Sequence, residues 1–227
     1  MKNSIKLIIS VIISLCYSNL LAEEDQFIRL TDMVKVSKES DQWLKVVIPF
    51  EIVNHPLKQK YEALRTPTTK DQVINLNFLD NLKVRLSICF SNDLQKDKLR
   101  RSNLPEAEFY QYYSSEIEFL TIRADRNKKY VNFLFPAEIA ERDGFLGAYV
   151  KPVGYVVEFI YDGIPLEISN NIFFGKYKEE NILEKFRQMC QTNSPKNEGI
   201  LVPAQVINSN QYLQGLGPVK RKPNSSY

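Results

Sequence analysis

The sequence predicts an all-β protein: a two-sheet β-sandwich of immunoglobulin-like or related topology, with one C-terminal amphipathic helix and short connecting helices. Three stretches carry this prediction. In Gly154–Asn170, two apolar-rich runs flank Asp162-Gly163, a dipeptide typical of a tight hairpin turn. Leu44–Val53 and Leu82–Phe90 place apolar residues at alternate positions, as strands with one buried face do.

The hairpin has a definite register if Asp162 and Gly163 form its turn. One face then collects apolar residues of both strands: Val157, Phe159, Tyr161, Ile164, Leu166 and Ile168. On the other face Pro165 is opposite Ile160 in a pair without mutual hydrogen bonds, so its missing N–H is tolerated at a sheet edge. We therefore expect Ile164–Ile168 to be an edge strand. Because another chain can add a strand at such an edge, Ile164, Pro165 and Leu166 form a candidate interaction surface.

The same register places Glu158 opposite Glu167 on the outer face. Like charges directly opposite each other are destabilising by about 0.2–1 kcal/mol, so we expect a neighbouring Lys or Arg, or failing that a cation, to offset them. A calcium site would need more oxygen ligands than this pair supplies. Two close carboxylates also occur in glycoside hydrolases, but a flat sheet face offers no cleft for a sugar.

The other elements are predicted from shorter signals. Further strands are expected over Phe27–Val36, Val73–Leu79, Ser115–Ala124, Lys129–Phe135 and Ile200–Ile207. Pro136–Arg142 is a short helix candidate with proline in its first turn and Gly144 after its end. Tyr177–Thr192 is the longer helix, because its apolar residues recur at helical spacing and its acidic residues cluster toward the N-terminus.

Residues 1–22 are typical of a secretory signal peptide. Lys2 and Lys6 flank the start of the short apolar run Leu7–Leu15, and Ala22 precedes an acidic stretch. We expect cleavage after Ala22 and export to the periplasm or the cell surface, with an uncleaved anchor as the alternative. Since no other segment is long and apolar enough to span a bilayer, we expect no transmembrane segment in the mature chain.

The signal peptide is expected to be followed by a single β-sandwich domain over 23–207, including the helix near 177–192, and by a disordered basic tail over 208–227. Removing Lys2 and Lys6 brings the 30 basic and 27 acidic residues of the whole chain close to balance. A nearly neutral mature chain gives no support for nucleic-acid binding.

Two of the three cysteines, Cys89 and Cys190, lie in the predicted domain. An even pair in an exported protein is a candidate disulfide. Cys89 projects from the outer face of its strand and Cys190 lies on the apolar stripe of the helix, so a helix laid over that face would bring them together. Two separate buried thiols are the alternative.

Few residues suit catalysis or metal binding. The single histidine, His55, lies in Asn54-His55-Pro56, which indicates an exposed loop histidine rather than a zinc ligand. Tyr110, Tyr112 and Tyr113 lie in the irregular stretch Asn92–Ser114, which is expected to be a loop, and form a candidate interaction surface; the alternative is packing across one end of the sandwich. Trp43 is either a stacking platform for sugar or a packing residue.

Six stretches, taken in order, resemble a small family of exported proteins of verrucomicrobial bacteria. They cover most of the predicted mature chain: WLKVVIPFEI (Trp43–Ile52), NLKVRLSICFSN (Asn81–Asn92), YYSSEIEF (Tyr112–Phe119), LFPAEIAERDGFLG (Leu134–Gly147), KPVGYVVE (Lys151–Glu158) and EGILVPA (Glu198–Ala204). The resemblance implies an immunoglobulin-like sandwich associated with a type IV pilus-like gene cluster. It implies no catalytic residue.

These observations favour a non-catalytic exported β-sandwich protein that acts in an envelope or surface assembly. Its expected partners are other envelope or surface proteins or further copies of itself, and no cofactor is expected. The alternative is a carbohydrate-binding module that uses Trp43 and the Tyr110–Tyr113 cluster. An enzyme is less favoured, because the chain lacks histidine partners, a serine elbow and metal-ligand spacing.

Overall fold

A computed structural model describes residues 26–62, 69–70, 73–99, 103, 109–146, 150–168, 171–174, 182–207 and 216–220. The predicted signal peptide lies outside the described residues. Within the described part of the chain, no helix has the length and apolar character needed to cross a membrane.

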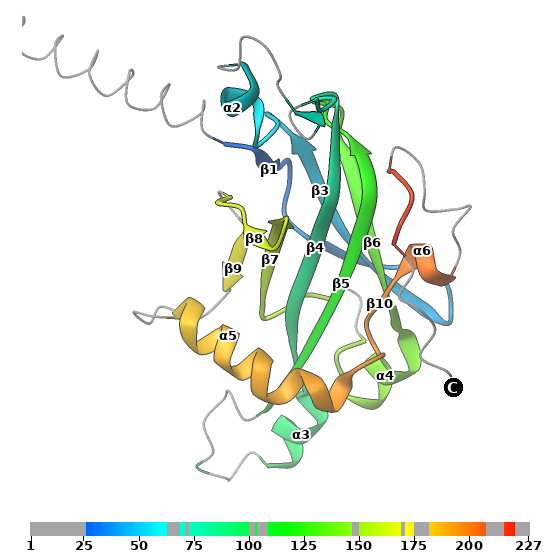
Figure 1. The fold of residues 1–227 in the computed structure, drawn as a ribbon. Helices are drawn as coiled ribbons and strands as arrows, with labels where there is room; N and C mark the ends of the chain where they lie inside the picture. Colours follow the sequence, from blue (N-terminus) through cyan, green and yellow to red (C-terminus); the bar gives the residue numbers. More distant parts are fainter. Residues whose placement is uncertain are drawn as a thin grey trace, which may run out of the picture.

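Two antiparallel sheets of five strands each form the body of the protein (Figure 1). Sheet A has the order β1-β3-β6-β10, with β2 also paired to β3. Its strands are β1 (Ile28–Leu30), β2 (Lys35–Lys38), β3 (Trp43–Ile52), β6 (Lys129–Pro136) and β10 (Val202–Pro203). Sheet B has the order β5-β4-β7-β8, with β9 also paired to β7. Its strands are β4 (Phe78–Ser91), β5 (Tyr110–Arg123), β7 (Gly154–Tyr161), β8 (Ile164–Pro165) and β9 (Ile172–Phe174).

The core lies between the two sheets because their strands turn alternate apolar residues toward each other. In β4, Leu82, Val84, Leu86 and Ile88 are fully buried in this core. Aromatic rings join the sheets: Phe50 of β3 contacts Phe159 of β7 at 5.0 Å between centroids, and Tyr113 of β5 meets Phe135 of β6 edge-on at 4.8 Å. The predicted mostly-β fold with two antiparallel sheets is therefore confirmed.

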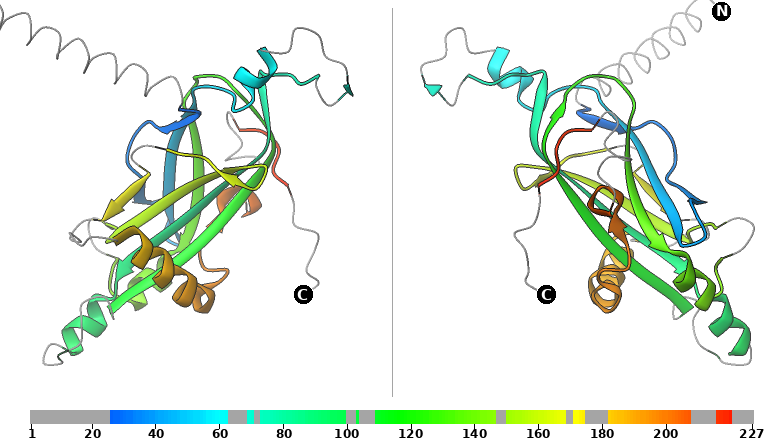
Figure 2. Two further views of the ribbon diagram at one scale, coloured as in Figure 1. Left: turned by 60° about the vertical axis from the view of Figure 1, so that its left-hand side comes forward. Right: turned by 90° about the vertical axis from the view of Figure 1, so that its right-hand side faces the viewer.

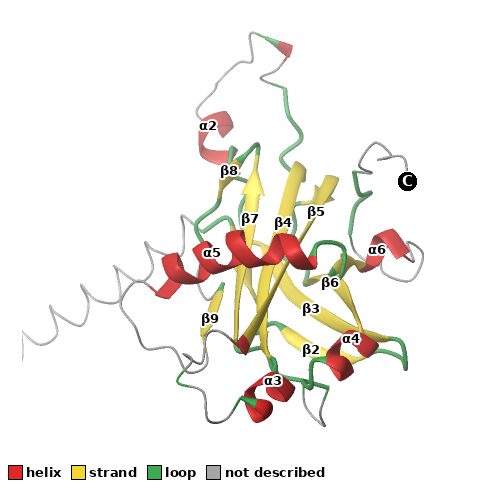
Figure 3. Cartoon of the chain, turned by 90° about the horizontal axis from the view of Figure 1, so that it is seen from below, coloured by secondary structure: helices red, strands yellow, loops and turns green. Residues whose placement is uncertain are grey.

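Short helices connect and cover the sheets. They are α2 (Lys58–Glu62), α3 (Asp93–Lys98), α4 (Ala137–Arg142), α5 (Ile182–Asn193), the 3₁₀ helix η3 (Ser194–Asn197) and α6 (Ala204–Ile207). The longest, α5, crosses the outer face of sheet B, the face turned away from sheet A (Figures 2 and 3). From α5 the chain passes beside β5, where the Asn197 amide donates to the Tyr112 carbonyl oxygen at 2.9 Å, and then reaches β6 of the other sheet through β10.

The hairpin keeps its predicted register only next to the turn. Asp162 and Gly163 both have positive φ, 47° and 78°, as a type I′ turn requires. The pairs Ile160 with Pro165 and Tyr161 with Ile164 are confirmed, and so is the position of β8 at the edge of sheet B.

The predicted pairing of the hairpin beyond Pro165 is wrong. After Leu166 donates to the Phe159 carbonyl oxygen, the chain leaves the strand pair, and Ile172 rather than Ser169 lies opposite Val156. Leu166 and Ile168 still pack against the core, as predicted, but the pairing resumes at β9 three positions further along the chain, with 156 opposite 172 instead of 169.

Part of the predicted disordered tail is ordered. Residues 216–220 lie along the outer edge of β5, where Leu120 donates to the Pro218 carbonyl oxygen and Lys220 donates to that of Glu118, each at 2.8 Å (Figure 2). Gly217 makes this approach possible, because a Cβ there would lie 1.5 Å from the Thr121 carbonyl oxygen. The remainder of the tail, 208–215 and 221–227, lies outside the described residues.

Candidate functional site

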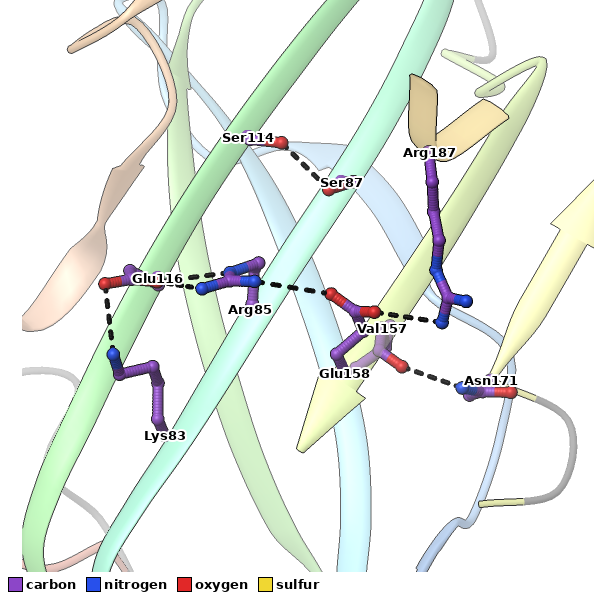
Figure 4. A network of polar contacts seen from close by, with 9 residues as sticks. All are labelled: Lys83, Arg85, Ser87, Ser114, Glu116, Val157, Glu158, Asn171 and Arg187. Atoms are coloured by element: carbon purple, nitrogen blue, oxygen red, sulfur yellow. Dashed lines mark hydrogen bonds and ion pairs between the residues drawn. The ribbon is translucent and has the colours of Figure 1, made fainter. Parts of the chain in front are cut away.

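The outer face of sheet B carries a row of charged residues that pair with one another (Figure 4). Arg85 of β4 lies opposite Glu116 of β5 on one side and Glu158 of β7 on the other. Its guanidinium donates to Glu116 at 3.0 and 3.1 Å and lies 3.7 Å from Glu158. Lys83 adds a second cation 3.5 Å from Glu116, and Arg187 of α5 donates to Glu158 at 3.0 Å. We call these five residues the ion-pair row.

The ion-pair row favours the charged form of the Glu116 carboxylate. Partial burial acts to raise the pKa of Glu116, but hydrogen bonds and charges from Arg85 and Lys83 outweigh it and leave that pKa below its ordinary value. A carboxylate of this kind is a poor proton donor near neutral pH. The geometry therefore suits fixing strands and α5 together better than general acid catalysis.

The predicted opposition of Glu158 and Glu167 is wrong. Glu167 is exposed and follows the end of β8, where the strand pairing has already stopped. Glu158 instead lies between Arg85 and Arg187, so the basic neighbours expected for it are present. Among the described residues, no group of three or more His, Cys, Asp or Glu side chains is placed to hold a metal ion.

Next to the ion-pair row, the outer face becomes apolar and lies beneath α5. A compact cluster forms there, which we call the α5 cluster: Cys89, Tyr110, Tyr112, Val156, Phe186 and Cys190. The Phe186 ring of α5 lies between two rings of sheet B, 5.8 Å from Tyr112 and 5.0 Å from Phe174 between centroids. The Phe174 ring packs directly over Gly154, which has no side chain in the way: a Cβ on Gly154 would lie 2.8 Å from that ring.

The tyrosines do not form the predicted exposed surface. All three belong to β5, and their exposed fractions are 7% for Tyr110, 3% for Tyr112 and 0% for Tyr113. Successive strand residues point to opposite faces, so Tyr112 lies under α5 while Tyr113 enters the core and its hydroxyl donates to Asp143 at 3.5 Å. Burial and the Asp143 charge raise the pKa of Tyr113.

Trp43 cannot join these tyrosines in one sugar-stacking platform. It is half-buried at the start of β3 in sheet A, opposite Pro136, whereas Tyr110 and Tyr112 lie on the outer face of sheet B. A carbohydrate-binding surface built from Trp43 and the tyrosine cluster is therefore not present in the fold.

The predicted exposed position of His55 is also wrong, since its exposed fraction is 6%. Its Nδ1 accepts a hydrogen bond from the Leu57 N–H at 3.1 Å, and its ring meets Tyr161 edge-on. Burial lowers the pKa of His55, so the ring is held neutral as a packing residue.

The two cysteines of the domain lie in the same cluster. Cys89 occupies the middle strand, opposite Tyr112 of β5 and Gly154 of β7, and Cys190 comes from α5. Both are free thiols in this structure. Burial raises the pKa of Cys190 to about 12, against a lowering effect of its hydrogen bond with Ser87, and raises that of Cys89 further, with the neighbouring Cys190 as the second cause.

Of the predicted edge surface, two residues are accessible. Ile164 is 67% exposed and Pro165 is exposed, while Leu166 is half-buried and packs against the core. Sequence reasoning missed Arg85 and Arg187 as the partners of Glu158; the alternation of β4 and the position of Arg187 on the helix were the available signals.

No protein-family model, curated protein or solved structure matches this chain.

Proposed function

We propose that this protein is a non-catalytic exported β-sandwich protein that binds another protein in an envelope or surface assembly. A type IV pilus-like system is the assembly that the sequence resemblance implies. The proposal combines the signal-peptide pattern of residues 1–22 with a domain whose ion-pair row is engaged in internal contacts.

We also propose that the sandwich is of the immunoglobulin-like type. In that fold, strands B and E pair in one sheet, while strands C and F pair in the other with G beside F. The pairs β3–β6 and β4–β7 match these two pairings, β8 and β9 take the place of strand G, and β5 takes the place of an added strand beside C. This correspondence supports an architecture in which loops and edges, rather than a central cleft, meet other molecules.

The chemistry of the outer face supports a non-catalytic function. Glu116 and Glu158 each form an ion pair with an arginine. The only histidine, His55, is buried, and its Nδ1 accepts a hydrogen bond from the Leu57 N–H. These groups lack the exposed, convergent arrangement that proton transfer or nucleophilic attack requires.

The observation that carries the binding proposal is the exposed apolar end of the β7–β8 hairpin. Ile164 exposes 67% of its surface at an edge of sheet B, next to Pro165, and Ile172 of β9 is 37% exposed on the same side of β7. An apolar edge of this kind is a surface on which a second polypeptide gains both burial and backbone hydrogen bonds.

Site-specific photo-crosslinking tests the proposal. A photoreactive phenylalanine analogue replaces Ile164 in the full chain, which is then expressed in its native cells, and the envelope fraction is irradiated. We expect one discrete adduct with an envelope protein or with a second copy of the chain. The matched control places the same analogue at Met33, which is 53% exposed in the connection between β1 and β2.

The two variants together decide the proposal. An adduct at Ile164 that is absent at Met33 supports it. A chain that stays in the cytoplasmic fraction, or an Ile164 variant without an adduct in an envelope fraction that contains the protein, contradicts it.

A further inference from the structure

The contact between α5 and sheet B contains both cysteines of the described chain, and both belong to the buried α5 cluster. Cys89 has no exposed surface and points outward from β4, the central strand under α5. Cys190 is 4% exposed and points down from α5. Its hydrogen bond with Ser87 places it directly over β4, because Ser87 is two residues before Cys89 and on the same face of the strand.

The pair lies among the residues that hold α5 to sheet B, where Leu183 and Met189 also pack against the α5 cluster. The helix is fixed by Phe186 between two rings and by the Arg187 ion pair with Glu158. Arg187 is 49% exposed, and an ion pair this open contributes little because solvent screens it. A covalent link beside Phe186 would secure the helix without further burial.

We propose that Cys89 and Cys190 form a disulfide that fastens α5 to the outer face of sheet B. The bond would close a loop of about a hundred residues that includes β5, β6 and β7, so it would also restrict the unfolded chain strongly. The inference rests on the position of the two residues and, for the oxidant, on the export that we propose for this protein.

The reaction is a thiol–disulfide exchange with a disulfide donor, such as oxidised glutathione or a protein disulfide oxidoreductase. One cysteine thiolate attacks the donor, forming a mixed disulfide and releasing one donor thiolate. The second cysteine thiolate then displaces the other donor thiolate. The protein loses two electrons and two protons, and the donor becomes two thiols.

The burial of both residues sets when this exchange occurs. Only the thiolate attacks a disulfide, and both cysteines are poorly ionised and inaccessible once α5 has docked. The bond therefore forms while α5 is undocked, during folding. Reduced protein that has already folded should react slowly until α5 detaches.

Peptide mapping of the full chain tests the inference directly. The protein is reduced, unfolded and refolded in a buffer with reduced and oxidised glutathione, and free thiols are then alkylated under denaturing conditions. Trypsin cuts after Arg85 and Lys96 and after Arg187 and Lys196, so each of the two cysteines lies in its own peptide. We expect one cross-linked species joining 86–96 to 188–196, which separates into two peptides on reduction.

Three variants complete the experiment. Cys89→Ser and Cys190→Ser should each abolish the cross-linked species, whereas Cys16→Ser should leave it unchanged. Refolded wild-type protein with a native circular dichroism spectrum and both peptides alkylated would overturn the inference, as would a bond from Cys16 to either residue. Because the wild-type chain supplies this result, the test stands even if a serine variant fails to fold.

A second measurement shows whether the bond fastens the helix. Limited proteolysis at Lys185 and Arg187, which are exposed on α5, should be slower in the oxidised protein by about tenfold or more, because cleavage follows the population of undocked helix. Equal cleavage rates in the oxidised and reduced proteins would show that the bond does not hold α5.

Discussion

The two faces of sheet B are built from the same strands but have different composition and different functions in the fold. Along β4, the inward residues Leu82, Val84, Leu86 and Ile88 are all fully buried and apolar. The outward residues change from charged at Lys83 and Arg85, through Ser87, to apolar at Cys89. The inner face therefore joins the two sheets over its whole length, whereas the outer face holds one helix and a row of ion pairs.

This difference indicates how stability is distributed. Loss of an inner contact weakens both sheets at once, and the effect should appear in the unfolding of the whole domain. Loss of an outer contact beneath α5 should release mainly the helix, because sheet B keeps its packing against sheet A. Three substitutions test this distinction, in decreasing order of expected effect.

The largest effect is expected from Phe159→Ala on the inner face. Phe159 is fully buried and contacts Phe50 across the core, so its removal leaves a cavity between the sheets. We expect the free energy of unfolding to fall by about 3–5 kcal/mol, measured by chemical denaturation. The matched control, Ile160→Ala, removes the half-exposed neighbour on the outer face and should cost less than about 1.5 kcal/mol. Equal losses in the two variants would contradict the distinction between the faces.

A smaller and more local effect is expected from Phe186→Ala in α5. The ring is 6% exposed and fills the space between Tyr112 and Phe174. We expect a loss of about 2–3 kcal/mol, at the low end for a buried aromatic residue because one side of the cluster is close to solvent. Hydrogen exchange should accelerate throughout α5 while the amides of β4 stay protected.

The control for that substitution lies on the same helix. Gln188→Ala changes an exposed side chain two residues from Phe186 and should leave exchange in α5 unchanged. If Phe186→Ala instead accelerated exchange equally in α5 and in β4, the helix and the sheet would be one cooperative unit.

The inner face was predictable from the sequence, but much of the outer face was not. Alternation in Leu44–Val53 and Leu82–Phe90 is a local signal that directly reports a buried face. The burial of Tyr112 depends instead on α5, which is about 70 residues away in the chain, and a tyrosine suits either a wet rim or a covered strand. Tyr110 and Tyr112 are two residues apart, which is the spacing of side chains on one face of a strand. This signal was overlooked because the stretch Asn92–Ser114 was predicted to be a loop.

The predictions for the hairpin pairing beyond Pro165 and for residues 216–220 of the tail were wrong for related reasons. The Asp162-Gly163 turn fixes the first two pairs, but the register with which the chain rejoins β7 at Ile172 is not set by the turn, and the local pattern does not report it. Gly217 could not be recognised as structurally important in a polar tail. It is needed because the tail backbone passes close to the backbone of Thr121 in β5, which is distant in sequence.

The smallest of the three effects is expected from Arg85→Met in the ion-pair row. This change removes the cation shared by Glu116 and Glu158 and leaves Lys83 beside Glu116 and Arg187 beside Glu158. Because the side chain of Arg85 is 42% exposed, we expect a loss of only about 1 kcal/mol at neutral pH and low salt, and less at high salt.

The pH dependence separates this electrostatic loss from a packing loss. The pKa of Glu116 in the folded protein is below its ordinary value, so its charged form stabilises the fold above the unfolded-state pKa near 4.5, and that stability disappears as the pH falls through the folded-state pKa. Wild type and Arg85→Met should therefore differ most at pH 7 and less at pH 3, when the same denaturation curves are measured. Arg126→Met, in an exposed turn, should show no such difference at either pH. A loss for Arg85→Met that is equal at both pH values would mean that the methylene stem of Arg85, rather than its charge, supports the outer face.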